Sequence, residues 1–458
     1  MGEKTQKKQK KAYKGRPVSP TRIIAVTFAA IILAGTLLLL LPVASRTGKS
    51  NGFTTALFTA TSATCVTGLV MGDTWSLWSG FGQGVILTLI EVGGLGFMSA
   101  ASVVLFLFRK KVGLRQRMIM AQAMSLNEME DVVRLQKWVL FGSLSVQFTG
   151  ALILFFRFLP SYGVGTAAWF SVFTAISAFC NAGFDVFGVL EPGQGMILFN
   201  NDPVICLTLI GLITVGSLGF FVWDEVVRVR RFSKMSVYTR LVLICAGVLL
   251  LGGSLVFLVL EWRNPATIGN MPFWQKLLNS TFQSATLRTA GFSAVDQGSL
   301  TEGSKAFSIL LMFIGGASGS TAGGLKTITV LVLVLFAWSK LRGRSSVNVF
   351  RHRIAESKVF DAMAIVFIVT GLAFFGSFVI CTTSGVSFLD ALYESASAIA
   401  TVGLSAVGTA RLSPVSHYLL IIFMYFGRVG VLTISLGFLM GNRAEDRFRY
   451  ADTNLLIG

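Results

Sequence analysis

Short glycine-containing segments interrupt this chain between stretches of strongly apolar sequence. The first segment reads TSATCVTGLVMGDT at residues 61–74 and carries no charge before Asp73. Of the 458 residues, 53% are hydrophobic and only 13% are charged, whereas soluble domains carry about 25% charged residues. The composition therefore predicts a polytopic membrane protein, in which a segment this polar is unsuited to face lipid.

Apolar stretches of two lengths alternate along the chain. A helix that spans a bilayer needs about 20 residues, and the stretch FTTALFTATSAT before the first glycine offers only about 12 residues. Non-helical backbone at membrane depth is tolerated only where it is buried in protein or lines a water-filled cavity. We therefore expect each short stretch to enter from the outer face, return to it and line a pore. The expected spanning helices cover residues 23–43, 83–108, 138–159, 204–227, 241–262, 307–338, 362–383 and 416–440.

Basic residues mark one side of the membrane. Most of the 39 Lys and Arg lie in five clusters, at 4–22, 109–137, 228–240, 340–358 and in the C-terminal tail. Short loops rich in Lys and Arg stay cytoplasmic. The net charge of +18 is therefore a topology signal with a contribution from anionic lipid, and it does not indicate nucleic acid. It predicts cytoplasmic N- and C-termini.

The four glycine segments align with one another. They read SATCVTG at 62–68, SAFCNAG at 177–183, SATLRTAG at 284–291 and SAIATVG at 397–403. The serine lies six residues before the glycine in three copies, and the third copy has one extra residue. This pattern, in one orientation and between like-placed basic clusters, predicts a fourfold duplication. The glycines, named the motif glycines below, are Gly68, Gly183, Gly291 and Gly403.

The residue types suit a cation filter. Backbone carbonyls can replace the lost hydration shell of a cation without carrying a full charge, and glycine supplies the unusual dihedral angles this requires. A short helix before each segment would direct its partially negative C-terminal end at the pore. The candidate filter residues are Thr64, Cys65, Val66, Thr67, Gly68, Phe179, Cys180, Asn181, Ala182, Gly183, Leu287, Arg288, Thr289, Ala290, Gly291, Ile399, Ala400, Thr401, Val402 and Gly403. Asp73, Asp185 and Asp296 follow the filters and are candidates for concentrating cations in an outer vestibule, or are solvated surface acids.

The apolar stretch 307–338 is too long for one straight span. Its 32 residues would extend about 48 Å as a helix, against a hydrocarbon core of about 30 Å. Its middle, GGASGSTAGG at 315–324, contains no large side chain. Small residues also allow close helix packing, but ten in succession favour an unwound, mobile segment that obstructs the pore below the filter. The candidate gate residues are Gly315, Gly316, Ala317, Ser318, Gly319, Ser320, Thr321, Ala322, Gly323, Gly324, Lys326 and Arg428.

Four ionisable residues lie within the expected membrane sections, where charges are costly and therefore functional candidates. Arg428 is expected to pair with carbonyls of the glycine-rich segment or to form an electrostatic barrier. Lys326 either contributes to the gate or snorkels to the interface. Arg288 is expected to brace its filter from behind, and the sequence assigns no partner to Glu91.

Enzymatic chemistry has little support in the sequence. The two histidines are distant from each other, the five cysteines show no CxxC spacing, and neither GxxxxGK[ST] nor a GxGxxG after a strand-like run occurs. We expect no enzyme activity, no metal site beyond the filter and no cofactor in this chain. An inverted-repeat carrier would need repeats of opposite orientation, and a scaffold would not need four filter-like returns.

The motifs TCVTG, CNAGF, RTAGF and ATVGL, together with IGGASGSTAGGLKT at 314–327 and FGRVGVLT at 426–433, resemble the Trk/Ktr/HKT superfamily of potassium transporters. The chain looks most like the bacterial Ktr-type membrane subunit over residues 20–458. The resemblance implies potassium as the transported substrate in a bacterial plasma membrane. A glycine in every filter, Gly68 included, implies preference for potassium over sodium.

The resemblance also implies partners. Ktr-type subunits form homodimers on a cytosolic ring of nucleotide-binding regulatory subunits, which would bring ATP or ADP to the complex. Sodium is a candidate activator. The basic inner loops and the tail RAEDRFRYADTNLLIG are candidate docking surfaces, or topology signals alone.

The expected fold is an all-α polytopic membrane protein. It has four parallel M1–pore helix–M2 repeats around a pseudo-fourfold central pore, with eight spanning helices and four re-entrant pore loops. The expected divisions are a basic N-terminal tail at 1–21, repeats at 22–110, 111–234, 235–345 and 346–441, and a C-terminal tail at 442–458.

Overall fold

The structure is a computed structural model that describes residues 20–96, 132–344 and 346–430. Expectations for the N- and C-terminal tails, for 97–131 and for 431–440 lie outside the described residues. In the described part, four helices are long and apolar enough to cross a membrane, or five if one bent pair counts as a single span. These four are α2 (Pro20–Leu40), α8 (Val132–Cys180), α11 (Val237–Leu260) and α15 (Glu356–Ser384). The expectation of eight spanning helices remains a prediction.

A shorter helix precedes each motif glycine. These helices are α3 (Phe53–Cys65), α12 (Phe273–Thr286), α16 (Phe388–Ile399) and the last part of α8, which follows a kink at Gly163. α3 has 13 residues, α12 has 14 and α16 has 12, so none of the three can cross a bilayer. Most of their side chains are buried, as the short apolar stretches predict.

A further helix follows each motif glycine, and each begins at a polar capping residue. The helices are α5 (Gly80–Gly94), α9 (Pro203–Leu218), α13 (Glu302–Phe313) and α17 (Pro414–Val429). The side chains of Ser79, Asp202, Thr301 and Ser413 accept hydrogen bonds from backbone N–H groups of the first turns. Such caps satisfy donors that have no partner within the helix. They fix where the chain turns back after each glycine segment.

One of these helices differs from the expected continuous span, and a second is interrupted where the sequence predicts a break. α9 ends at Leu218 and is followed by Gly219, whose φ is +90°. The axis of α10 (Phe220–Val229) makes an angle of 95° with that of α9. The expectation of one straight helix over 204–227 was therefore wrong, because a glycine at positive φ ends the helix. After α13, the backbone is not helical until α14 (Thr327–Leu341). That break coincides with the small-residue segment 315–324.

The fold is not entirely helical. A two-stranded antiparallel hairpin, β1 (Asn348–Val349) and β2 (His352–Arg353), joins α14 to α15, and the described residues are otherwise helical or irregular. The short elements are η1 (Pro42–Ala44), α4 (Thr74–Leu77), η2 (Phe187–Val189), η3 (Gly195–Phe199), η4 (Phe232–Lys234) and η5 (Thr409–Arg411).

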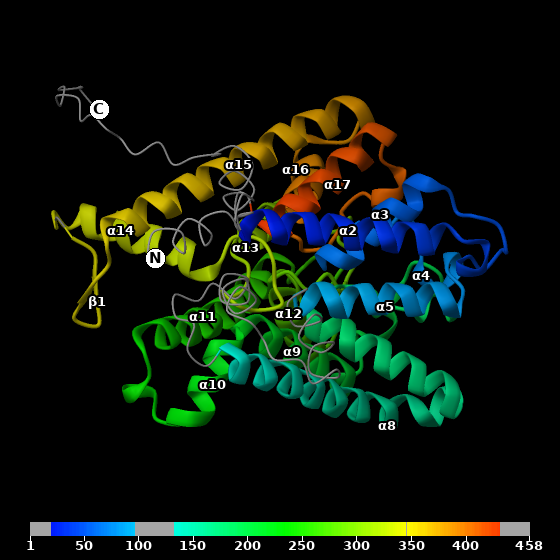
Figure 1. Ribbon diagram of the computed structural model, residues 1–458, viewed down its shortest axis with the longest axis horizontal. Helices are drawn as coiled ribbons and strands as arrows, with labels where there is room; N and C mark the ends of the chain where they lie inside the picture. The colour runs from blue at the N-terminus through cyan, green and yellow to red at the C-terminus, as the bar shows by residue number, and fades with distance from the viewer. Residues whose placement is uncertain (1–19, 97–131, 345, 431–458) are drawn as a thin grey trace, which may run out of the picture.

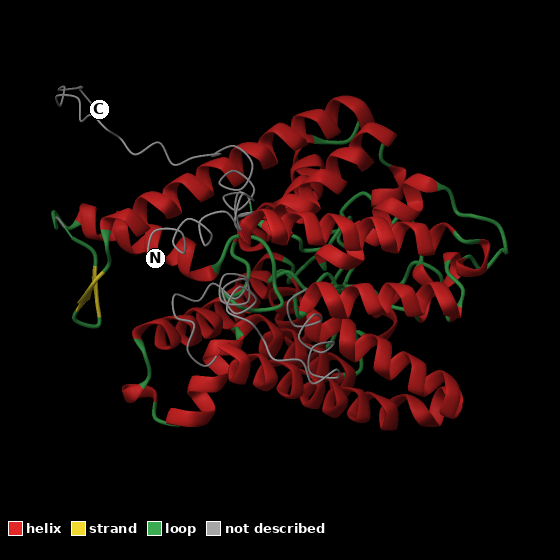
Figure 2. Cartoon of the chain, viewed as in Figure 1, coloured by secondary structure: helices red, strands yellow, loops and turns green. Residues whose placement is uncertain are grey.

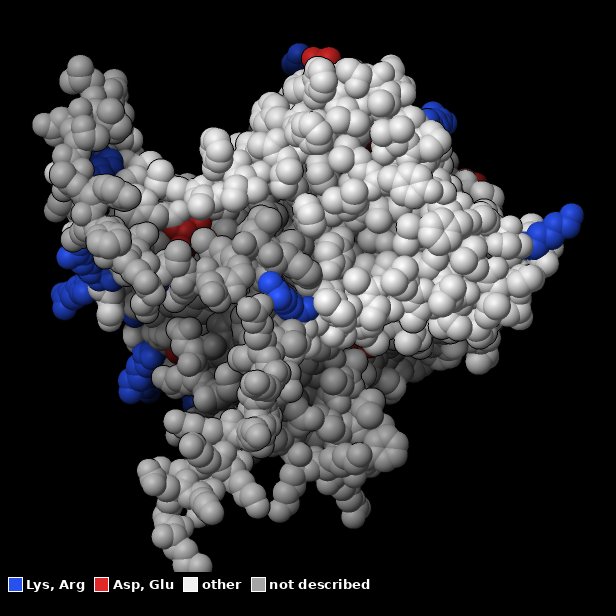
Figure 3. All heavy atoms as spheres, turned by 45° about the horizontal axis from the view of Figure 1, so that its top comes forward, with Lys and Arg blue, Asp and Glu red and all other residues white. Residues whose placement is uncertain are grey.

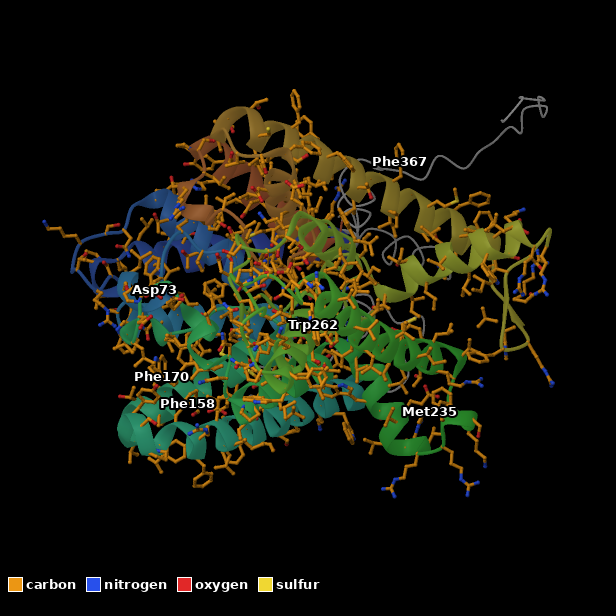
Figure 4. All side chains as sticks on the ribbon, turned by 180° about the vertical axis from the view of Figure 1, so that it is seen from behind. Asp73, Phe158, Phe170, Met235, Trp262 and Phe367 are labelled. Carbon is orange, nitrogen blue, oxygen red and sulfur yellow. The ribbon has the colours of Figure 1, made fainter. Side chains whose placement is uncertain are left out.

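The long helices surround the glycine segments (Figures 1 and 2). α2 packs on α3, α8 on α9, α11 on α12, and α15 on α16. The outer faces carry large exposed apolar side chains, such as Phe367, which is 81% exposed and projects away from the ribbon in Figure 4. In Figure 3, charged groups are sparse over most of the visible face. An exposed apolar surface of this extent is typical of contact with lipid.

Candidate ion pathway

The four motif glycines meet. A Cβ built on Gly68 would lie 3.2 Å from Cα of Gly183 and 3.3 Å from Cα of Gly403. One built on Gly183 would lie 2.7 Å from Cα of Gly291, and one on Gly291 would lie 3.4 Å from Cα of Gly403. Segments more than 100 residues apart in the chain therefore close a ring of backbone, and no side chain fits at its centre.

The backbone two residues before each motif glycine is also left-handed. φ is +56° at Val66, +60° at Asn181, +67° at Thr289 and +52° at Thr401, while the motif glycines themselves have φ between +69° and +95°. Positive φ at a residue with a side chain costs free energy and is retained where surrounding structure fixes it. The same irregular conformation in all four segments turns the peptide units in the same way. The sequence did not reveal this, because the four side chains share no common chemistry.

Hydroxyl groups brace the four turns. Ser62 Oγ accepts a hydrogen bond from the N–H of Gly68 at 3.1 Å, and Ser397 Oγ accepts one from the N–H of Gly403 at 3.1 Å. In the second segment Ser177 donates to the Phe184 carbonyl at 2.7 Å. These serines are the ones that the sequence alignment predicts.

The third segment differs from its alignment. Thr286 donates to the Phe292 carbonyl at 2.7 Å, which is the contact that Ser177 makes in the second segment. The aligned Ser284 instead contacts the carbonyl oxygens of Leu249 and Leu250 in α11. Thr286 therefore takes the place of the serine. It lies five residues before Gly291, so the third segment is one residue shorter than the others and not one longer.

Several buried polar atoms of these segments have no hydrogen-bond partner among the described residues. They are Oγ1 of Thr64, Thr67, Thr289 and Thr401, and Oδ1 of Asn181. Buried polar atoms are nearly always hydrogen-bonded, so each exception requires an explanation. Such atoms occur in all four glycine segments, where they are available to bind a ligand.

The helices that follow the motif glycines contact the glycine segments through a repeated G-x-x-G. This repeat was missed from the sequence. A Cβ on Gly93, Gly216 or Gly427 would overlap the carbonyl oxygen of Thr64, Phe179 or Ile399, respectively. The final glycine of each motif has positive φ at Gly96, Gly219, Gly319 and Gly430. The signal was present in the sequence as VGGLG, VGSLG, IGGASG and FGRVG, but its contact lies across two elements.

We expect Gly216→Ala to lower ion flux about tenfold and to lower the melting temperature, because the added methyl overpacks the filter backbone at a cost of about 1–3 kcal/mol. Gly211→Ala is the matched control, since nothing lies within 4 Å of a Cβ at Gly211 in the same helix. Rubidium flux into liposomes and thermal unfolding are the measurements. Equal flux and equal melting temperatures for the two variants would contradict the proposal that Gly216 supports the filter backbone.

The motif glycines form the floor of a cavity of about 360 Å³ that Asp73, Asp185 and Asp296 also line. Burial, with a contribution from Asp73, raises the pKa of Asp185 to about 7. All three acids that the sequence indicates therefore lie at one mouth of the ring.

The raised pKa predicts a pH dependence. As pH falls through about 7, Asp185 takes up a proton and this mouth loses a negative charge. We expect flux at low cation concentration to fall about twofold to fivefold between about pH 8 and pH 6. Asp185→Asn should flatten this profile at the lower rate. An unchanged profile in that variant would assign the dependence to another group.

The small-residue segment packs against the other side of the filters. Thr321 Oγ1 donates to the Phe179 carbonyl at 3.1 Å, and its N–H donates to the Gly216 carbonyl at 3.2 Å. A Cβ on Gly323 would overlap Oγ1 of Thr401, and one on Gly324 would lie 2.7 Å from the Ala400 carbonyl oxygen. Small residues are therefore required here because the segment touches filter backbone.

Arg428 of α17 links the small-residue segment to the end of α5. Its guanidinium donates to the Thr321 carbonyl through Nη1, and to the Gly93 and Gly94 carbonyls through Nη2. Hydrogen bonds from a charged donor are stronger than neutral ones. The structure thus pairs Arg428 with one carbonyl of the small-residue segment, in line with one of the two roles considered from the sequence, and with two carbonyls of α5.

The remaining candidates occupy defined places. Lys326 does not snorkel: its Nζ donates to the Ala322 carbonyl at 2.8 Å within the segment. Arg288 is 3% exposed, and its bracing role behind the third glycine segment stays a prediction. Glu91 accepts hydrogen bonds from Gln147 at 3.1 and 3.2 Å and from Cys180 at 3.4 Å.

A buried acid next to the fourth glycine segment was missed from the sequence. Glu394 in α16 is fully buried, and its carboxylate accepts hydrogen bonds from Ser405, from the N–H of Ala406 at 3.1 Å and from Thr409 at 3.2 Å. It therefore fixes the loop that leaves the fourth filter. An acid inside the short apolar stretch DALYESASAIA was the available signal.

This fold, in which four glycine segments meet beside an acidic mouth, matches a membrane cation transport protein. The chain belongs to the TrkH family, whose description is cation transport protein and whose model matches residues 3–445. This confirms the resemblance drawn from the motifs. The family consists of transporters, in agreement with the expectation that the chain is not an enzyme.

Relatives of known name cover nearly the whole chain. The potassium/sodium uptake protein NtpJ of Enterococcus hirae is 36% identical over 96% of this chain and 98% of its own length. The Ktr system potassium uptake protein B of Bacillus subtilis is 37% identical over 96% of this chain and 97% of its own. The crystal structure of the potassium transporter TrkH from Vibrio parahaemolyticus superposes with a TM-score of 0.72 over 93% of this chain and 86% of that chain, at 18% identity.

Proposed function

We propose that this protein takes up potassium across a bacterial plasma membrane through a central pore made by four parallel M1–pore helix–M2 repeats. The convergence of the four motif glycines carries the proposal, since backbone from all four repeats approaches one axis. The names of relatives at 36–37% identity, a potassium/sodium uptake protein and a potassium uptake protein, support potassium as the cargo. Eight helices then span the membrane, the broken and shorter ones included.

Selection of the ion takes place at the ring. Main-chain carbonyls of the residues before each motif glycine replace water around the cation, and the left-handed residues at Val66, Asn181, Thr289 and Thr401 direct those carbonyls inward. The short helices place their partially negative ends toward the same axis. Asp73, Asp185 and Asp296 raise the cation concentration at the outer mouth.

The small-residue segment 315–324 is the gate. It lies against the second and fourth filters, and Arg428 holds it to the end of α5. Opening requires Thr321 to break its contacts with the Phe179 carbonyl and with Arg428. In the closed state, the positive charge of Arg428 and a strip of backbone lie in the cation path. Lys326 closes the segment on itself.

Regulation involves partners. The protein acts as a homodimer on a cytosolic ring of nucleotide-binding subunits, which bring ATP or ADP, with sodium as an activator. Both termini are cytoplasmic, in keeping with the basic clusters of the sequence. In the homodimer and in its complex with the ring, the apolar outer surface of the long helices still faces lipid.

The test is rescue of a potassium-uptake-deficient bacterium at low external potassium, together with flux into liposomes. The protein should restore growth and carry rubidium in preference to sodium. Growth no better than the empty vector, with the protein present in the membrane, would overturn the proposal.

Gly68→Ser tests the ion selectivity of the ring. φ at Gly68 is +95° and its Cβ would lie 2.6 Å from the Ala182 carbonyl oxygen, so serine displaces a carbonyl of the adjacent filter. We expect sodium to compete with rubidium about tenfold more effectively than in the wild type. Unaltered competition in a well-expressed variant would contradict the carbonyl geometry at this position.

A further inference from the structure

A second cavity, of about 610 Å³, lies between α11, α14, the β1–β2 hairpin and the start of α15. These elements gather at the hairpin end of the molecule in Figure 1. Ser318 of the small-residue segment lines the same cavity. None of the residues proposed for the filter or the outer mouth takes part in it.

The cavity is amphiphilic. Most of its wall is hydrocarbon, supplied by residues such as Ile328 and Val332, while His352 and Lys358 lie at its polar part with Asp361. The Lys358 and Asp361 charges are 3.8 Å apart on side chains that are 74% and 60% exposed, and such exposed pairs contribute little free energy. Lys358 therefore remains available to an anionic ligand.

The charge around the cavity favours an anion. Residues 338–361 contain six Lys or Arg against two carboxylates. A soluble anion would leave the apolar part of the cavity empty, whereas an uncharged lipid would make no use of the basic rim. The chemistry that matches both parts is a phosphate headgroup carried on acyl chains.

The surrounding surface continues into lipid-facing helix. On α14 and α15, Leu341 is 82% exposed, Phe360 66% and Trp338 55%. The guanidinium of Arg342 lies 4.7 Å from the ring centroid of Trp338. Tryptophan beside basic residues is typical of the membrane–water interface, so the cavity opens where the inner leaflet presents its headgroups.

The cavity contacts the small-residue segment. Tyr238 of α11 lines the cavity and donates its hydroxyl proton to the Ser318 carbonyl at 3.1 Å. Tyr238 and Ile328 also pack against a buried apolar cluster that contains Ala317 of the segment. A molecule in the cavity therefore lies beside the side chain that holds one end of the segment.

We propose that this cavity binds an anionic phospholipid of the inner leaflet, and that the bound lipid acts on the small-residue segment through Tyr238. The binding site stands on the cavity and its charges alone. The effect on transport rests on the proposed function, in which that segment is the gate.

Native mass spectrometry of the purified protein with phosphatidylglycerol or phosphatidylcholine tests the site. Phosphatidylglycerol should be retained preferentially, and Lys358→Gln should weaken retention about fivefold. Val332→Trp, which fills the cavity, should abolish it. The controls are Lys234→Gln and Val334→Trp, which lie outside the cavity lining and should behave as the wild type. Equal retention of both lipids, or full retention by Val332→Trp, would overturn the site.

Flux into phosphatidylcholine liposomes with and without phosphatidylglycerol tests the coupling. The wild type should respond to phosphatidylglycerol, whereas Tyr238→Phe should bind the lipid and lose the response. A wild-type response in Tyr238→Phe would overturn the coupling through the hydroxyl. Selective lipid binding without any cation flux would refute the proposed function but not the lipid site. Cation flux without selective lipid binding would refute the lipid site but not the proposed function.

Discussion

Gly403→Ala is expected to reduce potassium flux about 100-fold, which corresponds to about 2.7 kcal/mol. Gly403 has φ of +94°, and a Cβ there would overlap the Thr67 carbonyl oxygen and lie 2.8 Å from Cα of Gly68. Alanine must therefore adopt a left-handed conformation, at a cost of about 1–3 kcal/mol, and must also displace the filter of the first repeat. Both effects move carbonyl oxygens away from the ion.

Gly385→Ala separates these two effects. Gly385 has φ of +67° in the same repeat, but nothing lies within 4 Å of a Cβ built there. It should lose some stability and keep nearly all flux. Rubidium uptake into liposomes at matched protein content is the measurement. If both variants lost flux equally, backbone strain alone would explain the result and the ring would have no special role.

Deletion of residues 317–322 is expected to raise flux about tenfold or more in the absence of any cytosolic partner. The deletion removes Thr321, which donates to the Phe179 carbonyl and accepts from Arg428. Hydrogen bonds to charged groups contribute about 1.5–3 kcal/mol each, and a loss of about 1.4 kcal/mol shifts a closed–open equilibrium tenfold. The pathway should therefore stand open more often.

Arg428→Gln provides a second route to the same state with the segment intact. It should raise flux by a smaller factor, while Arg231→Gln, which is exposed before η4 and lines neither cavity, should not. The measurement is flux into liposomes without nucleotide or partner, compared between Arg428→Gln and its control. Unchanged or abolished flux in deletion protein that unfolds at the wild-type temperature would contradict the gate.

The sequence was sufficient where a single segment determines the structure. The four long helices follow from hydropathy over about 20 residues, and the predicted spans 241–262 and 362–383 correspond to α11 and α15. The motif glycines were found because glycine adopts positive φ without the steric cost that other residues meet. The break at 315–324 was visible because so many small residues cannot sustain a packed helix.

Contacts between distant segments were beyond such reasoning. The bend at Gly219 depends on the hydrogen bond between the Phe220 N–H and the Gly319 carbonyl, 100 residues away. Thr286 was not chosen over Ser284, because both are hydroxyl residues and only their three-dimensional neighbours differ. Glu91 had no visible partner because Gln147 belongs to another repeat.

The most direct measurement is anomalous X-ray diffraction from crystals of the protein grown in rubidium. We predict an anomalous peak on the axis of the ring, at carbonyl distance from all four glycine segments, and its loss in Gly403→Ala but not in Gly385→Ala. A map in which the four motif glycines lie apart, or in which rubidium avoids their axis, would contradict the account.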